Sequence, residues 1–165
     1  MALDMFLALT GIAGESTDSA HKGEIQISSW SWGLSEPASA ASGESSAGAG
    51  KVSIQNIVIQ KNVDIASPLL IQHCAQGDRI VSGTVSVRKA GGGAGAVGKD
   101  FLLFKMTNVL VMSVTEEAAT SSDLPTETVT LAFSKFEFDY SALSATGAPG
   151  AQKSVGWDLA TAKVV

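Results

Sequence analysis

The chain has 165 residues and a formal net charge of −5 at pH 7. This length fits one domain that is large enough to fold without a disulfide or a metal ion. The acidic balance argues against binding to nucleic acid or anionic lipid, which requires clustered Lys and Arg. Charged residues make up only 16% of the chain, well below the roughly 25% of an average soluble protein. We therefore expect part of the surface to be buried in an assembly.

The N-terminus does not resemble a signal peptide. MALDMFLALTG has no basic region before its apolar run, and Asp4 interrupts that run. No window reaches the roughly 18 apolar residues of a membrane span. Cys74 is the only cysteine, so an internal disulfide is impossible. We expect synthesis and folding in the cytoplasm, and any export by a route that needs no cleaved leader.

The first third of the chain predicts two strands joined by a polar loop. Residues 2–10 read as a strand that is apolar on both faces, and residues 11–21 are polar and turn-rich. Residues 24–34 predict a long strand whose apolar parity changes, and a β-bulge near Ser28 and Ser29 would keep the core face. The apolar residues concerned are Ile25 and Ile27 before the change, and Trp30, Trp32 and Leu34 after it.

A low-complexity segment separates this strand from the next. Residues 36–50, EPASAASGESSAGAG, contain no bulky apolar side chain and predict a mobile loop. Residues 52–63 then predict a strand whose parity also changes. Its apolar residues are Val52 and Ile54, followed by Ile57 and Ile59.

One short helix is expected near residues 67–76. Ser67 is the predicted N-cap, Pro68 occupies the first helical position and Gly77 closes the helix. A helix this short needs packing against a sheet. The residues expected on its packed face are Leu69, Leu70, His73 and Cys74.

The remaining chain predicts further strands. They span residues 79–90, 100–116 and 128–140, with glycine-rich turns at 91–98 and 147–150. The expected core residues are Val81, Val85 and Val87, then Leu110, Met112 and Val114, then Val129, Leu131, Phe133, Phe136, Phe138 and Tyr140. The residues Val155, Trp157 and Leu159 end the sheet.

Four long strands change parity near their middles, which is typical of strands that bend at the corners of a barrel. We therefore predict an all-β fold: a β-barrel of two antiparallel sheets with one short α-helix. The whole chain, residues 1–165, is expected to form one domain without a fused effector domain.

Few residues suggest chemistry. His73 and Cys74 are adjacent on the helix and point about 100° apart, so they are not expected to form a nucleophile and base pair. Two histidines and one cysteine give no recognisable zinc motif. We expect no enzyme activity, and no catalytic, cofactor-binding or metal-binding residue. Trp30 and Trp32 share a face with Leu34, which favours a core position over a sugar-binding platform.

The outward residues of the tryptophan strand are more informative. If the indoles face the core, Ser29 and Ser31 face outward, as Ser113 and Thr115 do on the later long strand. These outer faces are small, polar and uncharged. They favour a surface that lines a channel or contacts another subunit.

Several short motifs together resemble one family. GES at residues 14–16, His21-Lys22, SWSWG at 29–33, K-x-x-D-x-x-SP at 61–68, RKAGG at 88–92 and GWDL at 156–159 are similar to the Hcp (haemolysin-coregulated protein) family. Hcp proteins form the tube of bacterial type VI secretion systems. The resemblance covers nearly the whole chain.

The resemblance implies a structural role. Six subunits would form a ring, and stacked rings would form an inner tube that a contractile sheath propels, with its spike proteins, into a target cell. The subunit is itself secreted, and effector proteins are carried in the lumen. Ser29, Ser31, Ser113 and Thr115 would face the lumen. The loop that reaches a neighbouring ring would contain Glu36, Ser39, Ser42, Glu44 and Ser45.

Two other readings remain open from the residues. A monomeric β-barrel that binds carbohydrate would require Trp30 or Trp32 to be exposed. A hydrolase would require a reactive thiol at Cys74.

Overall fold

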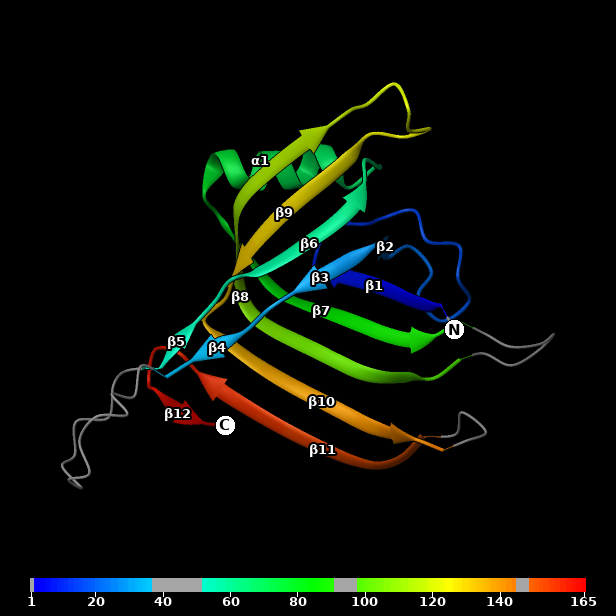
Figure 1. The fold of residues 1–165 in the computed structure, drawn as a ribbon. Coiled ribbons are helices and arrows are strands. Elements are labelled where there is room, and N and C mark those ends of the chain that lie inside the picture. Colours follow the sequence, from blue (N-terminus) through cyan, green and yellow to red (C-terminus); the bar gives the residue numbers. More distant parts are fainter. Residues whose placement is uncertain (1, 37–51, 91–97, 145–148) are drawn as a thin grey trace.

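The computed structural model describes residues 2–36, 52–90, 98–144 and 149–165 (Figure 1). The expected loop at 36–50 and the turn at 91–98 fall largely outside these residues, and of the turn at 147–150 only residues 149 and 150 are described, at the start of the last long strand. The described elements are β1 (Leu3–Leu9), β2 (Ile25–Gln26), β3 (Ser29–Ser31), β4 (Leu34–Ser35), β5 (Ser53–Ile54), β6 (Ile57–Asn62), α1 (Ser67–Gln76), β7 (Arg79–Lys89), β8 (Asp100–Glu117), β9 (Thr126–Ala132), β10 (Lys135–Leu143), β11 (Pro149–Asp158) and β12 (Lys163–Val164).

The strands pair into one branched antiparallel sheet. Its main path is β12-β11-β10-β8-β7-β1-β2, and β9, β6 and β3 branch from β8. Strand β2 pairs with β1, and the next strand along the chain, β3, pairs with β6. From β1, successive pairings lead through β7, β8, β9 and β6 to β3. Because β3 follows β2 directly in the chain, these strands form a closed circuit. This circuit encloses the core. The all-β class with one short helix is confirmed, although one branched sheet and a separate β4–β5 pair replace the two sheets expected.

The predicted strand over 24–34 is divided into β2, β3 and β4. At the first break, the Ile27 N–H donates to Met5 O at 3.1 Å, whereas the Ser28 N–H donates to Gln60 O at 2.8 Å. The chain therefore changes pairing partner between these two residues. The expected bulge within one strand is wrong; the parity change comes from a corner between two strand pairs.

β8 does contain a bulge, at Met112. The register with β9 shifts between Val111 and Ser113, so Met112 is the extra residue. Met112 is 50% exposed and Val111 is 2% exposed. The expected core position of Met112 is therefore wrong, because an extra residue reverses the parity of a strand. Val114, on the far side of the bulge, packs against the core as expected.

The core residue near the start of β7 also differs from expectation. Val81 is 72% exposed, whereas Ile80 is buried opposite Val109. On β8, Asn108 adopts a left-handed backbone with φ 58°, which interrupts the alternation of the pair at this point. Val85 and Val87 lie beyond the irregularity and are buried as predicted.

The helix matches its predicted range but begins differently. Ala66 is the N-cap, and Ser67 is the first helical residue and is buried. Gly77 closes the helix with φ 67° as expected, and its N–H donates to His73 O. Leu70 is fully buried in the core while Leu69 is 38% exposed, so the predicted packed face is only partly right.

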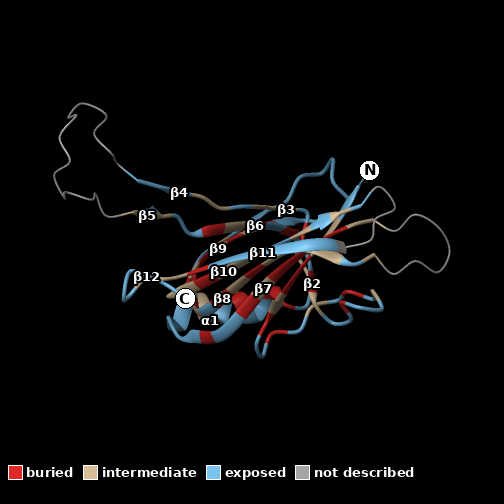
Figure 2. Cartoon of the chain, turned by 90° about the horizontal axis from the view of Figure 1, so that it is seen from below, coloured by how far each residue is buried: buried red, intermediate tan, exposed pale blue. Residues whose placement is uncertain are grey.

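Aromatic rings fill the centre of the core. Phe104 on β8 is fully buried and stacks on Phe136 of β10, with ring centroids 5.6 Å apart and an interplanar angle of 5°. Phe133 and Phe138 approach the Phe104 ring edge-on. Figure 2 shows β3 and β6 on one side of the buried residues and β7, β8 and α1 on the other. The core thus joins both parts of the branched sheet.

A buried ionic cluster, called here the Lys61 cluster, joins β6, β9 and α1. Lys61 and Glu127 are each 1% exposed, and their Nζ and Oε2 atoms are 2.6 Å apart. Lys61 Nζ also lies 2.9 Å from Asp64 Oδ1 and donates to Ser67 Oγ at 3.1 Å. The Ser67 hydroxyl donates to Glu127 Oε2 at 2.7 Å and accepts the Asp64 N–H. Ser67 is therefore occupied by this cluster rather than by capping its own helix.

Replacing Lys61 by Met should destabilise the protein by about 3 kcal/mol or more, because it leaves the Glu127 carboxylate buried without a cation. Urea unfolding at equal protein concentrations would measure the loss. The double variant Lys61→Met/Glu127→Gln should recover part of it, since the remaining buried charge is removed. Equal stability of wild type and Lys61→Met would show that the ion pair does not hold these elements together.

Candidate functional site

Small polar side chains form two rows across the outer face of β3, β6, β9 and residues 110–117 of β8. In each row, the residues lie directly opposite one another in the strand register, so their side chains share one face. We call this surface the polar face. Its rows are Ser31, Val58, Thr130 and Ser113, and then Ser29, Gln60, Thr128 and Thr115.

The polar face brings together all four residues that the sequence predicted to face a lumen. Ser31, Ser113 and Thr115 are exposed. Ser29 is half-buried, and its hydroxyl donates to Gln60 Oε1 at 3.0 Å. The outward orientation of these residues follows from the inward orientation of the row between them, in which Ile59 and Val129 on the neighbouring strands β6 and β9 are buried. Sequence reasoning missed Val58, Gln60, Thr128 and Thr130, whose positions depend on pairing.

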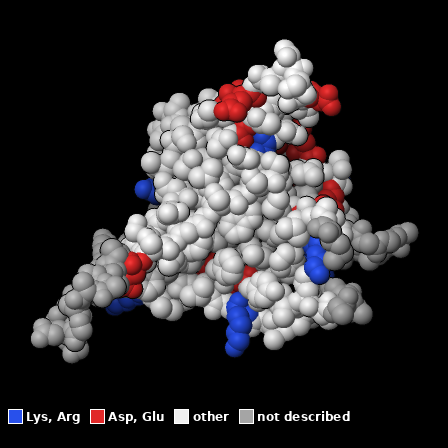
Figure 3. Space-filling view, viewed as in Figure 1, with Lys and Arg blue, Asp and Glu red and all other residues white. Residues whose placement is uncertain are grey.

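The polar face is uncharged in both rows. Figure 3 shows a broad surface without charged side chains over β3, β6 and β9, with charges gathered at its margins. The first charge appears one row further along, where Glu117 lies opposite Thr126. Such a surface can form many weak hydrogen bonds and apolar contacts but no strong ion pair.

Trp30 and Trp32 pack inward from the same segment. The Trp32 ring lies 4.8 Å from the rings of both Phe104 and Phe136, and the Trp30 ring lies 6.0 Å from Phe104. Both indoles are half-buried against the core. This arrangement disfavours the carbohydrate-binding reading, which requires an indole face open to solvent.

The helix residues His73 and Cys74 do not form a pair. His73 Nδ1 lies 2.7 Å from Asp78 Oδ1, and Cys74 is half-buried against the core. Among the described residues there is no group of three or more His, Cys, Asp and Glu arranged to hold a metal ion. Across the same ranges, no helix has the length and apolar character needed to cross a membrane.

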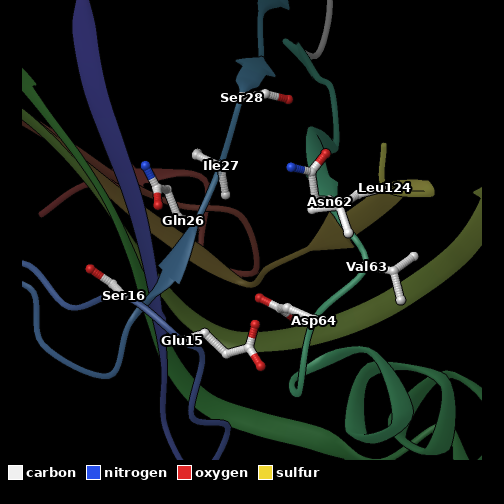
Figure 4. A pocket seen from close by; sticks show the side chains of 9 residues that line it. All are labelled: Glu15, Ser16, Gln26, Ile27, Ser28, Asn62, Val63, Asp64 and Leu124. Atoms are coloured by element: carbon white, nitrogen blue, oxygen red, sulfur yellow. The ribbon is translucent and has the colours of Figure 1, made fainter. Parts of the chain in front are cut away.

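A polar pocket of about 420 Å³ opens beside the β6–α1 connection. Figure 4 shows the side chains of Glu15, Ser28, Asn62 and Asp64 around it. Its serines are engaged in local hydrogen bonds: Ser16 Oγ accepts the Asp18 N–H, and the Ser28 hydroxyl donates to Gln60 O. Asp64 already pairs with Lys61. The pocket therefore shows hydrogen bonding that supports the loops and no activated nucleophile.

An apolar groove, also of about 420 Å³, lies between the β4–β5 pair and strands β10 and β11. Leu34 and Val155 are each 52% exposed along it. Apolar surface of this kind often marks a contact with another chain. Its lining residues are Trp32, Leu34, Glu36, Val52, Ile54, Phe136, Phe138, Val155 and Trp157.

The groove was not predicted, because its lining comes from four separated segments. Of the residues predicted for a ring-stacking loop, Glu36 is exposed and lies at the groove. Ser39, Ser42, Glu44 and Ser45 lie outside the described residues. The short apolar segments around Leu34 and Ile54 were a usable signal, because they form strands of only two residues, in which Leu34 is exposed and Ile54 is half-buried.

Comparisons with known proteins agree with the sequence motifs. The family described as "Type VI secretion system effector, Hcp" matches residues 6–140. Protein hcp1 of Pseudomonas aeruginosa is 36% identical over 160 residues, which cover 96% of each chain. A solved structure of a type six secretion system protein has a TM-score of 0.92 at 28% identity, covering 99% of this chain and 100% of that one. Hcp1 from Salmonella typhimurium has a TM-score of 0.81 at 30% identity, covering 100% of each chain.

Replacing Trp32 by Ala should lower the free energy of unfolding by about 3 kcal/mol, because the cavity left between Phe104 and Phe136 is only partly refilled. Trp32→Phe should lose much less. Urea unfolding measures both, and binding to immobilised polysaccharides provides the comparison. A Trp32→Ala variant that keeps its stability but loses polysaccharide binding would favour the carbohydrate reading.

Proposed function

The chain belongs to the Hcp family of type VI secretion system proteins, and on this premise we propose that it is a structural subunit of the secreted inner tube. Six copies form a ring, the rings stack into a tube, and effector proteins travel in the lumen. The observation that carries this proposal is the polar face. It gathers both predicted pairs of lumen residues, from distant parts of the chain, in two adjoining rows.

The chemistry of the polar face suits a lumen that must hold cargo and then release it. Ser, Thr and Val side chains are short, and β-branched ones lose little rotamer freedom on contact. Each contact with a cargo protein is weak, so retention depends on many contacts together. An uncharged wall also avoids a strong electrostatic preference for cargo of one sign.

The apolar groove is our candidate for the contact between neighbouring subunits in the ring. A closed ring uses two different surfaces of each copy, and the groove supplies one surface with few charges. Glu36 at its end leads into residues 37–51, which contain the remaining residues proposed for ring stacking. The low overall charge of the chain is consistent with surfaces that become buried on assembly.

The proposed tube role sets the location and the other partners. The subunit folds in the cytoplasm and, after firing, reaches the extracellular space or a target cell. The contractile sheath and spike proteins contact the assembled tube. This structural role requires no catalytic residue and no cofactor.

Ser31→Gln should leave the ring intact and weaken cargo retention, because a longer side chain projects from the polar face at the β3 end of one row. Light scattering should report about six times the 16.9 kDa subunit mass for both proteins. Co-purification of co-expressed effectors should fall several-fold. Ser122→Gln, at an exposed turn away from the polar face, is the matched control. Unchanged cargo retention in intact Ser31→Gln rings would place the cargo surface elsewhere, and a monomeric wild type at high concentration would refute the ring.

Val155→Lys should convert rings to monomers, because it places a charge in the apolar groove. The side chain is half exposed in the subunit, so the secondary structure should remain by circular dichroism. Val81→Lys, at a more exposed valine on β7, should leave the ring unchanged. The reverse result, with only Val81→Lys dissociating the ring, would move the subunit contact to β7.

A further inference from the structure

We propose that His21 is a pH-responsive clamp that holds the loop before β2 against the sheet. When the imidazole carries two protons, His21 donates a hydrogen bond to each of two carboxylates. When it carries one proton, it donates to only one of them. This inference concerns the subunit itself and does not depend on ring assembly or on cargo binding.

Both ring nitrogens of His21 face carboxylates. Nδ1 lies 2.9 Å from Glu24 Oε2, and Nε2 lies 3.0 Å from Asp100 Oδ1. A neutral imidazole has one N–H and can donate to only one of these oxygens, while the imidazolium donates to both. When His21 is neutral, one nitrogen lone pair therefore faces a carboxylate oxygen without a hydrogen between them.

The orientation of the imidazole is held by its packing. His21 is 6% exposed, and its ring stacks on Phe6 with a centroid distance of 4.3 Å and an interplanar angle of 10°. The His21 backbone N–H also donates to Asp18 Oδ1 at 3.1 Å. Rotation of the buried ring away from Glu24 and Asp100 would lose the stacking contact, so protonation is the simpler way to satisfy both carboxylates.

Several other charged groups surround the clamp. Arg88 on β7 lies over the Phe6 ring at 5.0 Å and pairs with Asp18, and its Nε lies 3.6 Å from Asp4 Oδ2 on β1. The Arg88 hydrogen bond lowers the pKa of Asp18 to about 2, so Asp18 remains charged throughout the range in which histidine titrates. The charged groups around this site, taken from the described residues, are the carboxylates of Asp4, Asp18, Glu24 and Asp100 and the guanidinium of Arg88. Of these groups, Glu24 and Asp100 are the two whose carboxylate oxygens meet the imidazole nitrogens.

The clamp connects two parts of the chain that meet at one end of the barrel. Asp100 begins β8, whereas Glu24 ends a loop closed by hydrogen bonds from the Gly14 N–H to Gly23 O and from the Ser16 N–H to Glu24 O. The same loop supplies Glu15 and Ser16 to the wall of the polar pocket (Figure 4). When His21 is doubly protonated, its hydrogen bonds to Glu24 and Asp100 thus connect the loop at the pocket wall with the start of β8.

The sign of the effect follows from the two states. The stabilisation by His21 is present at low pH, where the imidazolium donates twice, and is lost as the pH rises and the second proton leaves. His21→Gln removes the titration and keeps a polar side chain. Only one other histidine exists in the chain, and its variant His73→Gln is the matched control, since His73 lies on α1 beside Asp78.

Amide hydrogen exchange on the full chain tests the clamp. After correction for intrinsic exchange, protection of residues 14–24 and 98–102 in wild type relative to His21→Gln should rise about tenfold between about pH 8.5 and about pH 5.5. The difference in Tm between the two proteins should widen by about 3 °C over the same range. His73→Gln should behave as wild type. Light scattering at both pH values would show that assembly has not changed.

Two further measurements guard against a folding defect. Ring 15N chemical shifts should report an imidazolium at His21 at about pH 5.5. Asp100→Asn should keep the fold and lose most of the pH dependence, because the amide can donate to an unprotonated Nε2. A neutral His21 at the low pH, or a constant difference between wild type and His21→Gln across the range, would overturn the proposal.

Discussion

The fold depends on one buried ion pair, between Lys61 on β6 and Glu127 on β9. Removing an ammonium and a carboxylate from water is costly unless further hydrogen bonds satisfy them. Ser67 and Asp64 provide these bonds, and both lie at the start of α1. The cluster therefore fixes the helix against the strands whose other face carries the polar rows. The K-x-x-D-x-x-SP motif, first noted as a family resemblance, has this physical explanation.

The two faces of β3, β6, β9 and the end of β8 differ in their surroundings and in the chemistry of their side chains. Inward, Ile59 and Val129 lie fully buried in the common core. Outward, the intervening residues are uncharged, and all of them except Val58 are polar. Because a strand alternates strictly, the rigid core that holds the inner residues also fixes the spacing of the outer ones. The chain therefore presents a regular, uncharged outer surface that is built without any specialised side chain.

The alternation of apolar residues in the sequence indicated where the strands bend. It did not indicate whether a bulge or a change of pairing partner produces the bend. The change between Ile27 and Trp30 is real, but it marks a change of pairing partner rather than a bulge. A bulge at Met112 was not expected, and it reversed the predicted core face there. A parity change in a sequence says that the alternation is broken nearby. Which residue is extra is decided by the partner strand, which local sequence does not specify.

The sequence by itself determined the local properties: the all-β class, the helix range and its Gly77 end, the family motifs, and the outward orientation of Ser31 and Ser113. These follow from short-range periodicity and backbone preference. Only the tertiary structure decided which outward residues share a row, that the apolar groove exists, and that His21 meets Asp100. Each of these joins residues far apart in the chain, and the relative position of such residues is set by strand pairing and packing of the whole core.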